Sequence, residues 1–201
     1  MKKTPGTPKR REAAKKTPIK KDGNKKHEHQ NASTDTPLEG GRKVTFAIIT
    51  VSDTRTEATD LSGKLAIEIL KSAGHHVANH RVVKDEKHQI REAIQAALSM
   101  QDVEIVFLTG GTGISPRDTT SEAVGELLDK TLPGFGELFR QLSFFEIGTA
   151  TILSRASGGV AQGKAIFSAP GSRGAVKLAL EKIIIPESGH IVNELRKGTA
   201  Q

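Results

Sequence analysis

The sequence predicts an α/β fold of three layers, in which a mostly parallel β-sheet is flanked by helices on both faces. Two observations lead to this prediction. Short apolar runs rich in β-branched residues alternate with amphipathic stretches at helical spacing over residues 44–201. Most of these runs also lack alternating polar residues, which is typical of strands buried on both faces. Strands that alternate with helices favour a parallel sheet, because each helix returns the chain to the start of the next strand.

Four strands are predicted, each rich in apolar or β-branched residues. They span residues 44–51, 76–83, 104–108 and 164–169. Each is followed by a polar, acidic or glycine-rich segment, in which a strand is expected to end. We interpret Ser157-Gly158-Gly159 as a turn, and residues 150–155 as an irregular segment or a further strand.

Helices are predicted where apolar residues recur at helical spacing. The predicted helices are residues 64–72, residues 87–100, residues 119–128, a helix that begins near Pro133, residues 175–185, and a short helix after Pro186. Ser62 is the predicted N-cap of the first of these helices. Thr119 and Glu122 have the spacing of a capping box at the start of the third.

The first 43 residues differ in composition from the rest of the chain. They contain 13 Lys and Arg against 5 Asp and Glu, whereas residues 44–201 contain 17 against 18. The excess positive charge therefore belongs to this segment, which has almost no apolar residues to bury. We expect residues 1–43 to form a basic, disordered N-terminal extension and residues 44–201 to form one domain. The extension is interpreted as a solubilising tail, with weak contact to nucleic acid or another polyanion as the alternative.

Composition also excludes several kinds of site. The chain has no Cys, so it has no disulfides, thiolate metal sites or cysteine nucleophiles. No apolar run approaches the roughly 20 residues that a membrane-spanning helix needs. The basic N-terminus lacks the apolar core of a secretory signal, and we expect a cytoplasmic protein. The seven His lie in the extension or at positions that look exposed, and no Ser-His-Asp arrangement is indicated.

A glycine-rich passage, Thr109-Gly110-Gly111-Thr112-Gly113, follows a predicted buried strand and precedes a predicted helix. Such a loop can present backbone N–H groups to an anion. The known nucleotide fingerprints do not match, because Pro116 stands where a dinucleotide-binding fold requires its third glycine. The passage therefore predicts an anion site, with a tight structural turn as the alternative.

Polar residues follow each predicted strand, and in parallel sheets ligands bind beyond the carboxyl ends of the strands. These ends carry Ser52-Asp53, Lys84-Asp85, the loop 109–113 and Pro170-Gly171-Ser172. Asp85 and Asp118 are suited to a Mg²⁺ ion shared with phosphate groups, and Arg117 is suited to a phosphate. For each aspartate the alternative is helix capping or a surface charge.

Eight ordered motifs extend this pattern over most of the predicted domain. They are Thr50-Val-Ser-Asp53, Asp60-Leu-Ser-Gly63, Val83-Lys-Asp85-Glu86, Leu108-Thr-Gly-Gly-Thr-Gly113 with Arg117-Asp118, Pro133-Gly-Phe-Gly-Glu137, Leu142-Ser143, Ile152-Leu-Ser-Arg155 and Pro170-Gly-Ser172. With these motifs, residues 44–195 resemble the MoaB/Mog family of molybdenum cofactor biosynthesis proteins, and the Leu142–Gly148 stretch is most similar to its MoaB members.

The resemblance implies a molybdopterin-binding fold and, for active members, Mg-ATP-dependent adenylylation of molybdopterin to molybdopterin-AMP before molybdate insertion. It implies that Asp85 and Asp118 act in catalysis as Mg²⁺ ligands. The phosphate-binding residues that it implies are Thr109, Gly110, Gly111, Thr112 and Gly113. The residues that it implies for the pterin and the nucleotide are Ser143, Arg155, Pro170, Gly171 and Ser172. Asp53, at the end of its strand, is a further predicted binding residue.

The resemblance also implies partners. Molybdopterin and ATP are the expected substrates, Mg²⁺ is the expected cofactor, and the chain is expected to assemble as a homotrimer or homohexamer. A later-step molybdenum insertion protein is a further expected partner. No membrane partner is expected, and nucleic acid is expected only as weak contacts of the extension. The alternative function is a non-catalytic molybdopterin-binding or carrier protein of the same pathway.

Overall fold

The structure, a computed structural model, describes residues 1–2 and 42–197. The chain divides into two units, Met1–Thr36 and Pro37–Gln201, and every helix and strand described below belongs to the second. The predicted disorder of residues 1–43 therefore falls almost wholly outside the described residues, and the domain boundary at residue 43 stays a prediction. Arg42, just before that boundary, donates a 2.6 Å hydrogen bond to Glu104.

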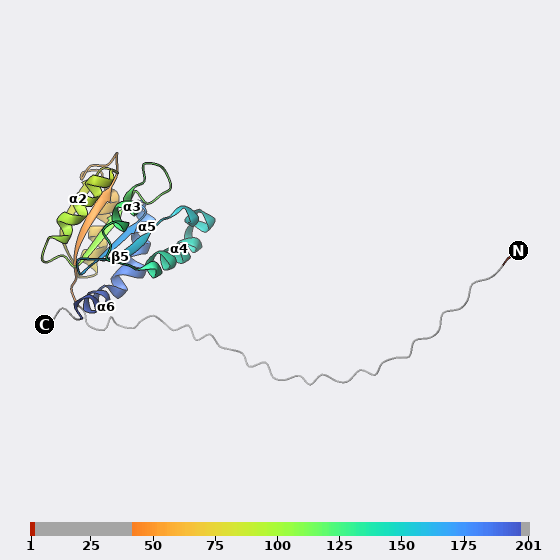
Figure 1. The fold of residues 1–201 in the computed structure, drawn as a ribbon. Helices are drawn as coiled ribbons and strands as arrows, with labels where there is room; N and C mark the ends of the chain where they lie inside the picture. The colour runs from red at the N-terminus through yellow and green to blue at the C-terminus, as the bar shows by residue number, and fades with distance from the viewer. Residues whose placement is uncertain (3–41, 198–201) are drawn as a thin grey trace, which may run out of the picture. The chain divides into compact units, whose positions relative to one another are not determined.

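A six-stranded sheet forms the centre of the second unit (Figure 1). The strands are β1 (Thr45–Val51), β2 (His76–Val83), β3 (Ile105–Thr109), β4 (Lys130–Thr131), β5 (Ser157–Ala161) and β6 (Lys164–Ala169), in the order β2-β1-β3-β6-β5-β4. β2, β1, β3 and β6 pair in parallel, whereas β5 and β4 add an antiparallel edge. The mostly parallel sheet confirms the predicted fold class.

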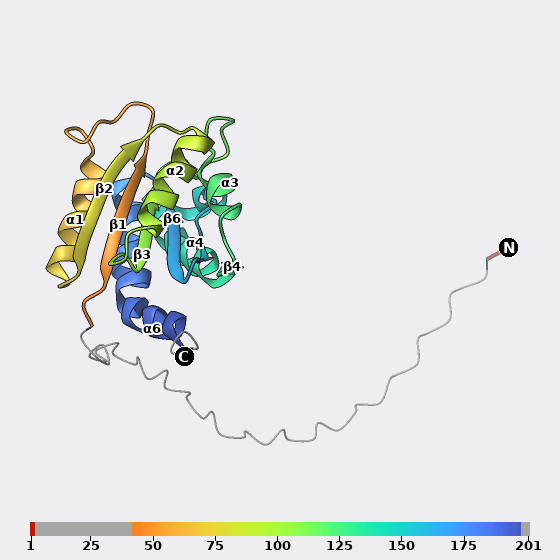
Figure 2. The same ribbon diagram turned by 60° about the vertical axis from the view of Figure 1, so that its left-hand side comes forward.

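Helices cover both faces of this sheet. They are α1 (Leu61–Ser72), α2 (Lys87–Leu98), α3 (Thr120–Gly125), α4 (Pro133–Ile147), α5 (Arg173–Ala179) and α6 (Ile185–Arg196), with a 3₁₀ helix η1 (Gly148–Leu153) after α4 and a π-helical turn η2 (Leu180–Ile184) between α5 and α6. α2 and α3 share one buried apolar cluster with the sheet, and α1, α4, α5 and α6 share the other. In Figure 2, α2 lies in front of the strands. The molecule therefore has the three layers that the sequence predicts.

Successive side chains of a strand point to opposite faces of the sheet, which explains why the central strands are largely apolar. In β1, Phe46 and Ile48 pack into the cluster on the α1 side, whereas Ala47 and Ile49 pack into the cluster on the α2 side. All four residues are at most 2% exposed. Because both faces are covered, the sequence of β1 shows a continuous apolar run and no alternation.

Several local predictions are wrong. Ser157-Gly158-Gly159 is part of strand β5 and not a turn, and residues 150–153 belong to the 3₁₀ helix η1. The first helix begins at Leu61 and its N-cap is Asp60, whose carboxylate accepts the amide of Gly63. Ser62 donates its hydroxyl elsewhere, as described below. The helix predicted at residues 175–185 is interrupted by η2 and continues as α6 to Arg196.

The four parallel strands end at the same edge of the sheet. In the register of the ladders, Val51 of β1 is paired with Val83 of β2, and Thr50 of β1 with Thr109 of β3. Thr109 is paired in turn with Ala169, the last residue of β6. Figure 2 shows the loops after β1 and β2, and the loop that leads into α3, at the upper end of the molecule. The polar segments singled out in the sequence are thus neighbours in space.

No helix within residues 1–2 and 42–197 combines the length and the apolar character needed to cross a membrane.

Candidate functional site

The glycine loop after β3 adopts a backbone that side chains rarely permit. Gly110 has φ +103° and Gly111 has φ +63°. A β-carbon added at Gly110 would lie 2.2 Å from the carbonyl oxygen of Val51, so the loop passes directly against the end of β1. The amide of Gly110 donates to the carbonyl of Ala169 at 3.0 Å. The loop is therefore fixed to the strands on both sides, and only glycine fits at position 110.

Three consecutive amides of this loop carry no intramolecular hydrogen bond. Within residues 42–197, Gly111, Thr112 and Gly113 donate their backbone N–H to no protein acceptor. Thr112 is only 2% exposed, and buried amides without a partner are rare. Successive unpaired N–H groups form a concavity that binds anions. This arrangement favours the anion site over the purely structural turn, although the amide of Gly110 is already used by Ala169.

Asp85 lies against the same loop. Its Oδ1 accepts hydrogen bonds from the amide and the hydroxyl of Thr119, at 2.9 and 3.0 Å. Its Oδ2 would lie 2.5 Å from a β-carbon added at Gly111. Burial raises the pKa of the Asp85 carboxyl; the two hydrogen bonds from Thr119 oppose this, and the nearby charges of Asp118 and Asp53 add to it. A carboxylate in this environment is stabilised by a cation.

Asp118 lies against the same loop, two residues further along it, at Gly113. Its Oδ2 accepts the amide of Ser115 at 2.8 Å and would lie 2.7 Å from a β-carbon added at Gly113. Because its charge raises the pKa of Asp85, the two carboxylates are close enough to interact across the glycine loop. The structure therefore brings the two predicted metal ligands together beside the unpaired amides.

The donor set fits Mg²⁺ held by few protein ligands. Within residues 1–2 and 42–197, no group of three or more His, Cys, Asp and Glu could hold a metal ion. Asp85 and Asp118 are two hard oxygen donors, and Mg²⁺ commonly takes one or two carboxylates and completes its octahedron with phosphate oxygens and water. The carboxylate pair suits a metal that arrives with a polyphosphate.

Thr119 begins α3 without the predicted capping box. Its side chain makes no capping hydrogen bond, and its hydroxyl donates to Asp85. Glu122, the other half of the predicted box, forms an ion pair with Arg155. Thr119 and Glu122 therefore bind side chains of the site and do not cap the helix. Their spacing of three residues is the same in both cases, so the sequence did not distinguish helix capping from this role.

Asp53 joins the loops after β1, β2 and β3. Its Oδ1 accepts the amide of Asp85 at 3.1 Å, and its Oδ2 accepts Nη2 of Arg117 at 2.9 Å. The hydrogen bond from Arg117 lowers the pKa of Asp53 most, followed by the hydrogen bond from the Asp85 amide. Asp53 is thus at the site as predicted, but in this structure its carboxylate binds protein groups.

Arg155, which precedes β5, reaches under the loop between β3 and α3. Its Nε donates to the carbonyl of Gly113 at 2.6 Å, and its Nη2 donates to the carbonyl of Asp118 at 2.8 Å. Its backbone amide donates to Thr112. Ser143 differs from the other predicted residues: it is buried on α4, and none of the hydrogen bonds between the loops of the described chain involves it.

The Pro170-Gly171-Ser172 segment after β6 lies directly beside the glycine loop. A β-carbon added at Gly171 would lie 3.2 Å from the Cα of Gly110, and the hydroxyl of Thr109 donates to the carbonyl of Pro170 at 3.2 Å. Ser172 caps α5 by accepting the amide of Ala175. All three predicted residues therefore line the same edge as the unpaired amides.

Two residues to which the sequence analysis gave no role in the site hold this segment. Ser62 donates its hydroxyl to the carbonyl of Gly171 at 2.8 Å, and Arg55 donates to the same carbonyl at 3.2 Å. Arg55 also donates to Ser62 at 3.1 Å. The signal was available in the Asp60-Leu-Ser-Gly63 motif, which places Ser62 in the first turn of α1 at the edge of the site.

A buried polar network lies behind α1 and corrects the view that every His is exposed. Asp60 is fully buried, and its Oδ2 accepts the hydroxyl of Thr50 at 2.5 Å and lies 3.0 Å from Nε2 of His80. Its Oδ1 accepts the amide of Gly63 at 2.9 Å. Burial alone would raise the pKa of Asp60, but the bonds from Gly63, Thr50 and His80 outweigh it and hold that pKa below the ordinary value of 3.8.

The Asp60→Asn variant is expected to unfold more easily at pH 7 than the native protein, by about 1–3 kcal/mol, because a buried charge-assisted network is weakened. A lowered folded-state pKa means that the stabilisation by Asp60 is present above the unfolded pKa and is lost as pH falls through the folded value. The difference between native protein and variant should therefore shrink below pH 3.8. Urea denaturation at a series of pH values measures it, and a difference that stays constant down to pH 3 would contradict the assignment.

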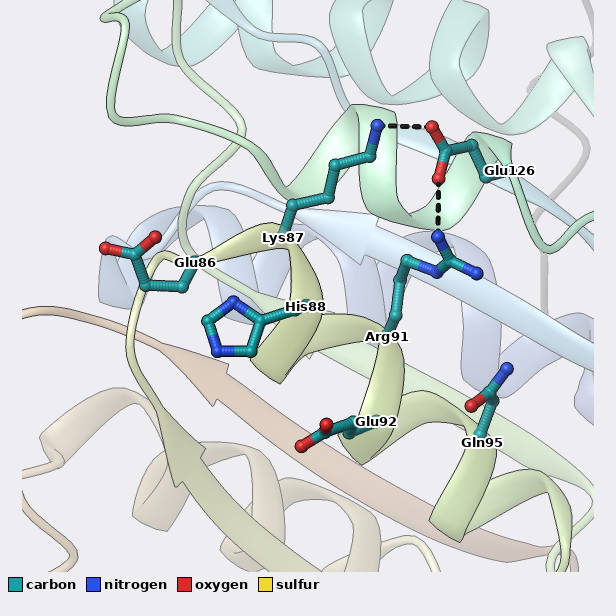
Figure 3. A pocket seen from close by; sticks show the side chains of 7 residues that line it. All are labelled: Glu86, Lys87, His88, Arg91, Glu92, Gln95 and Glu126. Atoms are coloured by element: carbon teal, nitrogen blue, oxygen red, sulfur yellow. Dashed lines mark hydrogen bonds and ion pairs between the residues drawn. The ribbon is translucent and has the colours of Figure 1, made fainter.

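A separate groove of about 600 Å³ lies along the outer face of α2 (Figure 3). It is lined by Glu86, Lys87, His88, Arg91, Glu92, Gln95 and Glu126. In Figure 3, Lys87 and Arg91 both point to Glu126, with which they form ion pairs, whereas Glu86 points away from that pair. The groove is lined by charged and polar side chains of α2 and by Glu126, and no glycine of the loop after β3 lines it, so it differs in chemistry from the edge of the sheet.

The chain is similar to known proteins of one family. A family model described as a probable molybdopterin binding domain matches residues 47–190, which run from within β1 into α6. The chain belongs to this family. Within it, the chain is 56% identical over 151 residues to molybdenum cofactor biosynthesis protein B of Bacillus subtilis, an alignment that covers 75% of this chain and 89% of that protein.

Solved structures of MoaB proteins share the fold. The crystal structure of a molybdenum cofactor biosynthesis protein B has 52% identity and a TM-score of 0.77, covering 79% of this chain and 99% of that one. The tungsten cofactor synthesizing protein MoaB from Pyrococcus furiosus has 40% identity and a TM-score of 0.70, covering 77% and 98%. The resemblance to MoaB proteins stated from the sequence is confirmed, and the chain is a MoaB-family member of molybdenum cofactor biosynthesis.

Proposed function

We propose that this MoaB-family protein transfers the adenylyl group of ATP to the terminal phosphate of molybdopterin. An oxygen of the pterin phosphate forms a bond to the α-phosphorus of ATP, the bond from that phosphorus to the β-phosphate oxygen breaks, and pyrophosphate leaves. The products are molybdopterin-AMP and pyrophosphate. The observation that carries this proposal is the placement of two interacting carboxylates, Asp85 and Asp118, beside the unpaired amides of Gly111–Gly113.

Each group has a role that follows from its chemistry. The three amides would bind phosphate oxygens and hold the triphosphate in one orientation. Asp85 and Asp118 would hold Mg²⁺, which supplies positive charge to the phosphate groups when it is bound. Transfer of a phosphorus group needs mainly positioning and charge stabilisation, and needs no protein nucleophile. This agrees with a chain that has no Cys and whose edge loops offer backbone amides and carboxylates.

The second substrate would lie on the β6 side of the same edge. Pro170 and Gly171 lie against the glycine loop there, Ser172 follows them as the N-cap of α5, and Arg155 donates to the carbonyl of Gly113. We assign the pterin to this side; Ser143, which is buried on α4 and takes no part in the hydrogen bonds of these loops, is not assigned to it. With this assignment, the terminal phosphate of molybdopterin and the α-phosphate of ATP are bound by the same group of loops, so the attacking oxygen and the α-phosphorus are close together.

The test is to incubate the full chain with molybdopterin, ATP and Mg²⁺ and to measure pyrophosphate. Release that requires all three components supports the adenylyltransferase. Binding of molybdopterin without pyrophosphate release would refute catalysis and leave the carrier function in the same pathway. Absence of both binding and release would remove this site from either function.

We also propose that the chain assembles with copies of itself through an apolar surface on α4 and η1, here named the α4 patch. The exposed side chains that define it are Leu138, Phe144, Phe145, Ile147, Ile152 and Leu153, with exposures from 40% to 79%. Six large apolar side chains exposed on two consecutive helices, with the rings of Phe144 and Phe145 in contact, are typical of an interaction site. A homotrimer or homohexamer would cover it.

Replacing Phe145 with aspartate is expected to convert the assembly to monomers, because Phe145 is 79% exposed and a charge would be buried at each interface. Light scattering coupled to size-exclusion chromatography measures the mass. Leu61→Asp is the matched control, since Leu61 is 59% exposed on α1 outside the α4 patch and should leave the mass unchanged. An unchanged trimer or hexamer in the Phe145 variant would exclude this surface.

A further inference from the structure

Arg117 connects three loops at the edge of the sheet. It comes from the segment between β3 and α3, and its Nε and Nη2 donate to Oδ2 of Asp53, at 3.2 and 2.9 Å. Its Nη1 donates to Oε1 of Glu86 at 2.8 Å. Asp53 follows β1 and Glu86 follows β2. The guanidinium therefore lies across the ends of the strands, over the side of the site that carries Asp85.

Arg117 faces an excess of negative charge. Asp53, Glu86, Asp85 and Asp118 are four carboxyl groups from the same loops, and the charges of Asp118 and Asp53 raise the pKa of Asp85. Arg117 forms ion pairs with two of the four. In the protein without ligand, this guanidinium supplies positive charge to two carboxylates that lie beside the proposed metal ligands Asp85 and Asp118.

The contacts of Arg117 are of a kind that can be exchanged. The side chains of Arg117, Asp53 and Glu86 are 57%, 38% and 42% exposed. Ion pairs with this much solvent access contribute little to stability and are readily replaced by other partners. The guanidinium is also the group best matched to a phosphate, because its N–H donors can bind two phosphate oxygens at once.

The loop itself has a second attachment that does not depend on these ion pairs. Arg155 donates from below to the carbonyls of Gly113 and Asp118, at 2.6 and 2.8 Å. Backbone carbonyls carry no net charge, so a metal ion that binds the carboxylates does not compete with these hydrogen bonds of Arg155. Release of Arg117 from Asp53 and Glu86 would therefore leave the glycine loop in place.

We propose that Arg117 is a further binding residue of this site, and that it exchanges the carboxylates of Asp53 and Glu86 for a phosphate of the incoming metal-bound triphosphate. The metal then supplies positive charge to the carboxylates, and Arg117 supplies it to the phosphate. The identity of the triphosphate rests on the proposed function, but the exchange itself is a property of these loops and can be tested without turnover.

The test uses the full chain, Mn²⁺ as a spectroscopic probe for Mg²⁺, and inorganic tripolyphosphate. The variants are Arg117→Gln and, as the matched control, Arg91→Gln, since Arg91 is 44% exposed and is paired with Glu126 in the groove on α2. Electron paramagnetic resonance measures the affinity for Mn²⁺ alone. Titration calorimetry measures the affinity for tripolyphosphate in the presence of Mn²⁺, and circular dichroism checks the fold.

The two affinities are expected to change in opposite directions in Arg117→Gln. Mn²⁺ alone should bind about 2- to 5-fold more tightly, because a competing cation is gone. Mn²⁺-tripolyphosphate should bind about 10- to 100-fold more weakly, because charge-assisted hydrogen bonds to a phosphate are lost. Arg91→Gln should change neither.

Either unchanged affinity in a folded Arg117→Gln protein would overturn the exchange, as would weaker binding of Mn²⁺ alone. The result is separable from the proposed function. A protein that shows both shifts but releases no pyrophosphate keeps Arg117 as a binding residue and loses the adenylyltransferase. A protein that releases pyrophosphate without these shifts keeps the enzyme and loses the role of Arg117.

Discussion

Asp85→Asn and Asp118→Asn are each expected to lower the rate of pyrophosphate release about 100-fold or more, because each removes a charge that the metal and the phosphates require. The fold should be spared. The carbonyl oxygen of an asparagine at position 118 can still accept the amide of Ser115, and that of an asparagine at position 85 can still accept the hydrogen bonds from Thr119. Initial rates at saturating Mg-ATP measure the effect.

Asp102→Asn is the control for these two variants. Asp102 is an exposed residue between α2 and β3, at the amino end of a parallel strand and so at the opposite edge of the sheet. Its loss of charge should leave the rate unchanged. Near-normal turnover in either Asp85→Asn or Asp118→Asn would remove that residue from the mechanism. A large loss in Asp102→Asn would show that the rate responds to charge anywhere on the protein.

Gly110→Ala is expected to destabilise the protein by about 2–5 kcal/mol, and so to lower the melting temperature by roughly 5–15 °C. Alanine at φ +103° is strained, and its β-carbon would lie 2.2 Å from the carbonyl oxygen of Val51. The loop has to move away from β1 to accept it. The unpaired amides would then shift, and the affinity for Mg-ATP should fall even where the variant still folds.

Gly125→Ala provides the comparison for this glycine. Gly125 ends α3, lies in helical backbone and has no atom within 4 Å of an added β-carbon. Alanine there should be neutral or slightly stabilising. Calorimetric melting of both variants checks the prediction. Equal melting temperatures for Gly110→Ala and the native protein would mean that the loop is not held against β1.

The parallel half of the fold could be predicted because its strands carry a strong local signal. A strand buried on both faces has to be largely apolar, and β1, β3 and β6 are. The antiparallel edge could not be predicted, because the sequence of β5, SGGVA, has no strand pattern and its strand conformation depends on packing against neighbouring elements. A β-carbon at Gly158 would lie 2.7 Å from the ring of Phe167, so a glycine that looks like a turn is required by a neighbouring strand.

The positions of the site residues could be predicted for a geometric reason. Parallel strands in register bring the residues that follow them to one edge, so Asp53, Asp85 and the glycine loop had to meet. Their partners could not be predicted. The bond from Ser62 to Gly171 joins residues 109 positions apart, and His80 reaches Asp60 from the neighbouring strand. Such contacts follow from packing between elements, which leaves no periodic signal in the sequence.

In the proposed site, the unpaired amides of Gly111–Gly113 bind a triphosphate whose metal lies on Asp85 and Asp118. The most direct measurement is a crystal structure of the full chain with Mg²⁺ and the non-hydrolysable analogue α,β-methylene-ATP. We predict triphosphate oxygens within hydrogen-bonding distance of these amides, and Mg²⁺ bound to at least one of the two carboxylates. A nucleotide bound instead in the groove along α2, or a metal ion far from both aspartates, would contradict the account.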